Sequence, residues 1–309
     1  MKVTVQETTY ENYGKCVVIS NGTAELYVTV DLGPRVIRYG FIGGENVFLN
    51  DLDRETFNDD PSIKDYWKHS DRWSIYGGHR LWTSPELMPE TYYPDDLPVQ
   101  WEATEAGAVF TQANQMPLGK QLSIEISMGE GTAVTMVHKS TNTSNTPQEY
   151  ALWTLSVLAP GGISVLPVPN RETGYLPNRV LSLWPYSNMN DPRVFWGKDY
   201  ITLRQDTTAE TPFKLGLSNE AGAAAYLNRG VCFVKKYDHV MGGNYPDFGV
   251  SYEGYTNAKF LESETLGELK TVAPGETISH TERWNLLDFC PAFDPQNEEA
   301  IKKIAEQIF

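Results

Sequence analysis

The sequence predicts an all-β fold, a large antiparallel β-sandwich with a short C-terminal helix. Short segments in which apolar and polar residues alternate recur along the whole chain, and turns rich in glycine and proline separate them. A helical apolar period is convincing only near the C-terminus. The 309 residues, 40% of them apolar, can bury a sizeable core, and no linker or repeat interrupts them. We therefore expect one domain over residues 1–309.

The alternation is clearest in a predicted hairpin over residues 122–136, where Gly129-Glu130-Gly131 makes the turn. Another strand is expected around Leu26, Val28 and Val30. Further strands are expected at 16–20, 35–41, 99–104, 108–112, 149–158, 200–204, 231–236, 249–255, 258–264 and 277–286. An apolar stripe, Ile301, Ile304, Ala305 and Ile308, predicts a helix over about 297–308, and a short helix could form near 59–70. The Pro-rich stretches 83–98 and 166–198 are expected to be either functional loops or ordered packing loops.

Composition restricts the partners. The net charge is −15, from 25 Lys+Arg and 40 Asp+Glu, and no basic run occurs, so nucleic acids and anionic membrane surfaces are excluded. No apolar run approaches the length of a membrane span or a signal peptide, and we expect a cytoplasmic chain.

Cys16, Cys232 and Cys290 lack metal-binding spacing and are expected to be buried thiols. The 8 Trp and 17 Tyr include more rings than a core requires and suit stacking on sugars.

The first segment that could carry chemistry is Asp31-Leu32-Gly33-Pro34-Arg35-Val36-Ile37, in which a strand ends in a turn and a second strand leaves it. Arg35 stands at the start of the second strand. It is either a solvated arginine of a plain hairpin or a donor to ligand oxygens at the mouth of the sandwich.

The second segment is Tyr76-Gly77-Gly78-His79-Arg80-Leu81-Trp82-Thr83-Ser84-Pro85-Glu86. The paired glycines allow a close approach of backbone to a ligand or to another strand. His79, Arg80, Trp82 and Glu86 combine an imidazole, a cation, a stacking surface and a carboxylate within eight residues. We predict that this segment contributes to a functional site. A metal site at His79 and Glu86 lacks recognised spacing, so no metal is predicted.

The third segment, Phe260-Leu261-Glu262-Ser263-Glu264, places Glu262 and Glu264 on one face of a strand. Their mutual repulsion would raise one pKa and make one of them a base, unless the strand is a solvated edge. Asp247, in a turn-rich segment just before this strand, could accept sugar hydroxyls or could simply be a turn residue.

In their order and spacing these motifs resemble the galactose mutarotase-like superfamily, the aldose 1-epimerases and their relatives. The resemblance covers residues 15–287 and rests on Leu-Gly-Pro-Arg-Val-Ile near the start and Phe-Leu-Glu-x-x-x-Leu-Gly with Pro-Gly-Glu near the end. The stretch Gly-Gly-His-Arg-Leu-Trp resembles a less characterised branch. The resemblance implies a supersandwich of antiparallel strands with a sugar-binding cleft on its concave face.

In aldose 1-epimerases a Glu accepts the proton of the anomeric hydroxyl and a His gives a proton to the ring oxygen. Glu262 matches that Glu. Trp153 stands where the His is expected, and an indole does not transfer protons at neutral pH. The resemblance therefore leaves His79, or else His239, as the acid.

We expect a small-molecule carbohydrate as partner, no cofactor, and acid/base epimerisation of a mono- or oligosaccharide. Glu262 and His79 would be catalytic, and the saccharide would contact Arg35, Arg80, Trp82, Glu86, Trp153, Asp247 and Glu264. Two other functions stay open: a non-catalytic sugar-binding or sensing module on the same fold, and a lyase acting on a uronate, since arginines also permit an anionic sugar. The sequence does not predict an oligomeric state.

Overall fold

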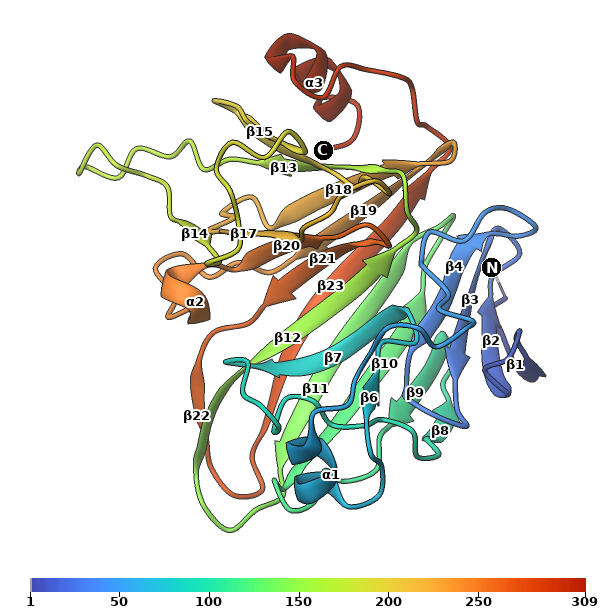
Figure 1. The fold of residues 1–309 in the computed structure, drawn as a ribbon. Coiled ribbons are helices and arrows are strands. Elements are labelled where there is room, and N and C mark those ends of the chain that lie inside the picture. Colours follow the sequence, from blue (N-terminus) through green and yellow to red (C-terminus); the bar gives the residue numbers. More distant parts are fainter. Residues whose placement is uncertain (1) are drawn as a thin grey trace.

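The computed structural model describes residues 2–309, which form two large antiparallel sheets packed as a sandwich, as predicted (Figure 1). The first sheet has 11 strands. Ten follow the spatial order β1 (Thr4–Thr9), β2 (Lys15–Ser20), β3 (Ala24–Thr29), β4 (Val36–Phe41), β7 (Gly78–Ser84), β12 (Gln148–Leu158), β21 (Leu261–Leu266), β20 (Tyr252–Thr256), β17 (Phe213–Leu217) and β14 (Leu181–Leu183), and β22 (Lys270–Val272) pairs with β12.

The second sheet has 10 strands, in the order β15 (Val194–Trp196), β16 (Tyr200–Arg204), β13 (Ile163–Pro167), β18 (Ala223–Asn228), β19 (Val231–Tyr237), β23 (Thr277–Leu287), β11 (Val134–Asn142), β10 (Lys120–Met128), β9 (Gly107–Thr111) and β8 (Gln100–Ala103). A small sheet pairs β5 (Phe57–Asn58) with β6 (Trp73–Ser74). The helical segments are α1 (Pro61–Trp67), the single turn α2 (Pro246–Gly249) and α3 (Glu298–Ala305).

The predicted hairpin is β10 and β11. Ile126 pairs with Met136, and the Gly129 amide donates to the Ala133 carbonyl at 2.8 Å. Every second residue of β10 is buried, because one face of the strand looks into the sandwich. Alternation was therefore a sufficient signal here.

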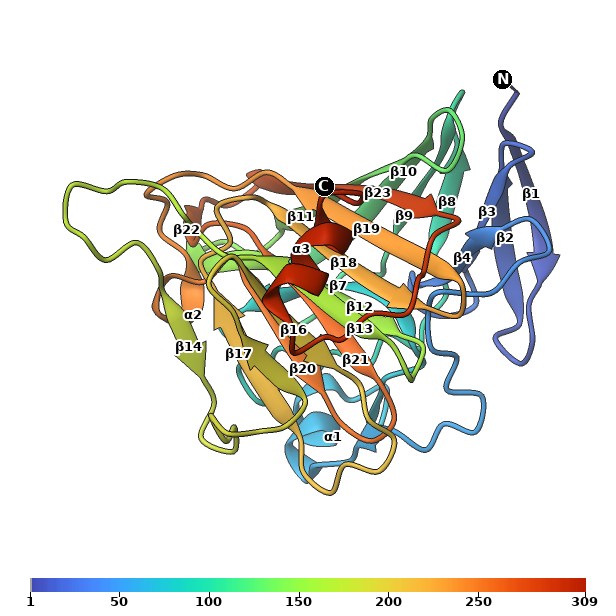
Figure 2. The same ribbon diagram turned by 90° about the horizontal axis from the view of Figure 1, so that it is seen from above.

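The C-terminal helix also follows its predicted stripe. Asn297 caps α3 by accepting from the Ala300 amide, and Ile301 and Ala305 are fully buried. Figure 2 shows α3 lying over the second sheet, where it packs on residues of β13, β18 and β19. Among residues 2–309, no helix combines the length and the apolarity that crossing a membrane requires.

The first sheet is covered on both of its faces, and this determines where a site can lie. Its inner face meets the second sheet in the main apolar core, around Trp284. Its outer face carries a separate aromatic cluster that includes Trp67 of α1, Trp73 of β6, Trp82 of β7 and Trp153 of β12. The central strands β7 and β21 are consequently buried along their whole length.

Candidate functional site

A cavity of about 400 Å³ opens on the outer face of the first sheet, beside the aromatic cluster. We call it the carboxylate cavity. Its lining combines seven aromatic side chains of tryptophan and tyrosine with five charged ones. These residues are Trp73, Trp82, Tyr92, Trp153, Trp184, Tyr186, Tyr255, Arg80, Glu86, Lys214, Glu262 and Glu264.

The strand register brings residues that are distant in sequence onto this face. Leu155 of β12 lies between Arg80 of β7 and Glu264 of β21, and Glu264 lies opposite Glu253 of β20. Trp82 pairs directly with Trp153. Because alternate residues of a strand share a face, Arg80 and Trp82, like Glu262 and Glu264, project to the same side.

The cations of the cavity are held by aromatic rings as well as by carboxylates. Arg80 Nη1 lies 3.1 Å from Glu262 Oε1, and its guanidinium lies 4.4 Å from the Trp82 ring centre. Lys214 Nζ lies 4.8 Å from the Trp153 ring centre and 4.6 Å from that of Trp184. These contacts order the tryptophans around the charged groups.

Lys214 also separates two carboxylates that the register places opposite each other. Its Nζ lies 2.7 Å from Glu253 Oε2 and 3.1 Å from Glu264 Oε2. The Trp153 indole donates a further hydrogen bond of 2.8 Å to Glu264 Oε2. Like charges on directly paired residues destabilise a sheet, so the ammonium is what allows both acids to stand there.

Three buried polar atoms of this group have neither a hydrogen-bond nor an ion-pair partner within residues 2–309, namely Arg80 Nε, Glu253 Oε1 and Glu264 Oε1. Burial, opposed by Arg80 and reinforced by Glu264, raises the pKa of Glu262. Burial would lower the pKa of Lys214, but Glu264 and Glu253 together raise it. Buried unpaired acceptors and donors are costly unless a ligand satisfies them, so the cavity fits a ligand rich in hydroxyl groups.

Six of the residues singled out in the sequence line this cavity. They come from β7 and the loop that follows it, from β12 and from β21, and they are Arg80, Trp82, Glu86, Trp153, Glu262 and Glu264. The other three, His79, Arg35 and Asp247, lie elsewhere.

The expectation that His79 faces the same hollow as Glu262 is wrong. His79 precedes Arg80 in β7, so it points to the inner face, where it is fully buried. Its Nε2 lies 2.7 Å from His138 Nε2, and its Nδ1 lies 2.8 Å from Ser156 Oγ. His138 Nδ1 faces the carbonyl of His280 at 3.1 Å.

These contacts define one neutral hydrogen-bond chain. Because a carbonyl only accepts, His138 carries its proton on Nδ1, and its Nε2 accepts from His79 Nε2. The remaining His79 Nδ1 then accepts from the Ser156 hydroxyl. Burial lowers the pKa of His138 to about 4, against the charge of Glu282, so the ring is neutral near pH 7. His79 therefore belongs to the interior of the sandwich.

The imidazoles of His79 and His138 and the carboxylate of Glu282 also lie within 4.8 Å of one another, as the ligands of a metal ion would. Glu282 is already engaged: it accepts from the Trp284 indole at 2.8 Å and pairs with Lys235 at 3.1 Å. A divalent cation would add its charge beside the Lys235 ammonium in a dry core with one carboxylate. The hydrogen-bond chain fits this group better than a metal does.

Arg35 and Asp247 lie outside the carboxylate cavity. Arg35 is fully buried, and its Nη2 pairs with Asp95 at 2.8 Å, so it is not solvated, and it does not line the carboxylate cavity. Asp247 has a φ of 53° in the turn α2, and its carbonyl accepts from Ser182 Oγ. Arg35 therefore does not have the sugar-contact role expected for it, and Asp247 does not line the carboxylate cavity, so its expected sugar contact stays a prediction.

Sequence reasoning missed Lys214 and Glu253. Lys214 is the polar residue in Phe213-Lys214-Leu215, an alternating segment whose strand was not expected. The two Pro-rich stretches do contribute to the site: Glu86 and Tyr92 come from the first, and Trp184 and Tyr186 from the second.

Comparisons with known proteins agree on the fold. No family model matches the sequence, and no curated protein is similar enough to count as a match. Among solved structures, a galactose mutarotase-like protein from Clostridium acetobutylicum superimposes with a TM-score of 0.55 at 10% identity, over 93% of this chain and 99% of that one. One from Lactobacillus casei gives 0.53 at 11% identity, over 88% and 100%. A TPR-domain containing protein from Parabacteroides distasonis gives 0.60 at 14% identity, over 90% of this chain and 48% of that one.

Proposed function

We propose that this chain binds a saccharide in the carboxylate cavity and exchanges its anomers by acid/base chemistry, with Glu262 as the base. The galactose mutarotase-like fold supports the sugar as ligand. The observation that carries the proposal is the buried Glu262 carboxylate, which lines a cavity walled by tryptophans and has Arg80 as its one ion-pair partner within residues 2–309. Sugar rings present apolar faces for stacking and hydroxyls for hydrogen bonding, which is the complement of this lining.

Each step of the exchange has a candidate group. Glu262 accepts the proton of the anomeric hydroxyl as the bond from the anomeric carbon to the ring oxygen breaks. Lys214, kept protonated by its two carboxylate neighbours, gives a proton to the ring oxygen, so that an open-chain aldehyde with a free hydroxyl forms. After the carbonyl rotates, ring closure returns one proton to Lys214 and the other from Glu262 to the new anomeric oxygen. Trp82 and Trp153, which carry Arg80 and Lys214 against their rings, form part of the wall that borders the sugar.

The charges in the cavity favour a neutral sugar. Three carboxylates line it, Glu86, Glu262 and Glu264, against the two cations Arg80 and Lys214. Both cations are within ion-pair distance of carboxylates. A uronate or a sugar phosphate would add negative charge to this surplus, so a neutral aldose is preferred to the substrate of a uronate lyase.

Exchange spectroscopy by NMR tests the proposal. The protein is added to each of a panel of neutral aldoses, and α–β exchange is compared with the same sugar in buffer. We expect accelerated exchange for at least one aldose, accompanied by a change in tryptophan fluorescence, because Trp73, Trp82, Trp153 and Trp184 line the cavity. Exchange at the buffer rate for every sugar that binds would refute the catalytic step.

A second candidate is a non-catalytic saccharide-binding module. The observation that favours it is that no imidazole is among the residues 2–309 that line the cavity. This candidate predicts the fluorescence change without accelerated exchange, so the same experiment separates the two functions.

The pH profile gives a further prediction. Because the pKa of Glu262 is raised, its base form is lost at a higher pH than that of an ordinary glutamate as the solution is acidified. We expect kcat/KM for anomer exchange to fall on the acid side with a midpoint above about 4.3, the usual value for glutamate. A rate that stays level down to that pH would mean that Glu262 is not the base.

A further inference from the structure

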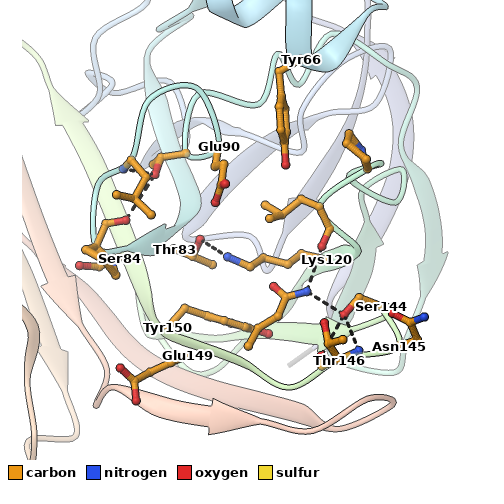
Figure 3. A pocket seen from close by; sticks show the side chains of 16 residues that line it. Tyr66, Thr83, Ser84, Glu90, Lys120, Ser144, Asn145, Thr146, Glu149 and Tyr150 are labelled. Carbon is orange, nitrogen blue, oxygen red and sulfur yellow. Dashed lines mark hydrogen bonds between the residues drawn. The ribbon is translucent and has the colours of Figure 1, made fainter.

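A second cavity, of about 450 Å³, surrounds Lys120 at one end of the sandwich, between the loops that follow β7 and precede β10 and β12 (Figure 3). We call it the Lys120 cavity. Tyr66, Thr83, Glu90, Glu149 and Tyr150 are among its lining residues, and it shares none with the carboxylate cavity.

The ammonium group of Lys120 lies in this cavity without a close counter-ion. The residue is 7% exposed, and its Nζ donates to Thr83 Oγ1 at 3.0 Å. Its Nζ also lies 4.2 Å from the ring centre of Tyr150. Within residues 2–309 no carboxylate forms an ion pair with it, whereas the buried Lys214 and Lys235 both have one. Burying an ammonium in this way favours the neutral amine.

We propose that Lys120 is a nucleophilic amine that forms a reversible imine with a small aldehyde or ketone entering the Lys120 cavity. The lone pair of Nζ forms a bond to the carbonyl carbon, and the carbonyl oxygen takes up a proton to give a carbinolamine. The carbinolamine then loses its hydroxyl group with a proton as water, and a carbon–nitrogen double bond remains. A desolvated lysine in a cavity is a recurrent nucleophile of this kind.

The charged surroundings are compatible with this step. Burial, opposed by Glu90, lowers the pKa of Lys120 to about 8, so a large share of the amine is neutral near pH 8. Glu90 and Glu149 are the acidic groups that line the cavity, and Tyr66 and Tyr150 are its phenols. The two carboxylates disfavour an anionic ligand and stabilise a protonated imine, so the carbonyl compound that fits best is uncharged.

Reductive trapping tests the inference. The full chain is incubated with glycolaldehyde and cyanoborohydride between pH 6 and pH 10, and labelled lysines are quantified by peptide mass spectrometry. We expect Lys120 to react at least about tenfold faster than the exposed Lys64 at pH 7.5, because an ordinary lysine is almost wholly protonated there. The rate at Lys120 should level off above pH 8, whereas that of Lys64 should go on rising.

The variant Lys120→Arg keeps the positive charge and removes the amine that forms an imine. It should lose the fast labelling, and Lys64→Arg, the matched control, should retain it. Labelling of Lys120 no faster than that of Lys64 in the unmodified chain would overturn the proposal, and that readout does not depend on the variant folding. Anomer exchange in the carboxylate cavity is a separate measurement, so failure of either proposal is recognisable by itself.

Discussion

Glu262→Gln should lower kcat for anomer exchange by about 100-fold or more, the usual contribution of a positioned acid or base. The amide keeps the shape and size of the side chain and can still meet sugar hydroxyls, but it cannot accept the proton. Binding should therefore change much less than turnover, with the saccharide Kd from tryptophan fluorescence within about tenfold of the unmodified chain. The comparison of kcat with Kd is what identifies a base rather than a binding group.

A stability measurement and a control variant are needed to show that a loss of activity is not a loss of folding. Removing the Glu262 charge leaves Arg80 with one fewer nearby carboxylate, so the melting temperature must be measured alongside activity. Glu125→Gln serves as the matched control, because Glu125 lies on the second sheet in a half-exposed pair with Lys139. Equal losses of kcat in the two variants, or a Glu262→Gln protein that exchanges anomers at the original rate, would remove Glu262 from the mechanism.

The sandwich could be predicted because many of its strands, among them β10, β11 and β23, have one face toward solvent. In β10 every second residue is buried, and the alternation is visible in the letters alone. The central strands of the first sheet are different, since β7, β21 and most of β12 are buried on both faces. In these strands the sequence pattern does not show which polar residues face the main core and which face the aromatic cluster.

That ambiguity explains the misplaced histidine. Alternation already requires His79 and Arg80 to face opposite sides of one strand. It does not say which side holds the cavity, because the main core and the aromatic cluster are both apolar. The acid pair drew attention to this strand, because two like charges on one face require a cation, a ligand or solvent, and the resemblance to aldose 1-epimerases then singled out Glu262.

Lys214 could not be inferred for another reason. It meets Glu264 across 50 residues of sequence and Glu253 across 39, and only the pairing of β17 with β20 and of β20 with β21 brings the three together. Strand order in a large antiparallel sheet is set by the packing of the whole molecule, and the alternation within one strand carries no record of its neighbours.

The interior network around Glu282 should be far more sensitive to substitution than the cavity. Glu282 and Lys235 are 0% and 1% exposed, and the hydroxyls of Thr154 and Thr265 also donate to Glu282 Oε1. Glu282→Gln leaves the buried Lys235 ammonium without its ion-pair partner. Loss of one partner of a buried pair costs about 3–5 kcal/mol, so the free energy of unfolding in urea should fall by that amount.

The cost is large because the pair is buried, and two further variants test this explanation. Glu125→Gln removes the same charge from a half-exposed pair, and its cost should stay below about 1 kcal/mol. Lys235→Met combined with Glu282→Gln removes both charges, so the double variant should be more stable than the sum of the two single losses predicts. If Glu282→Gln unfolds at the same urea concentration as Glu125→Gln, the interior carboxylate is not the counter-charge that holds Lys235. The two sheets would then be joined there by apolar packing and by neutral hydrogen bonds such as that between His79 and His138.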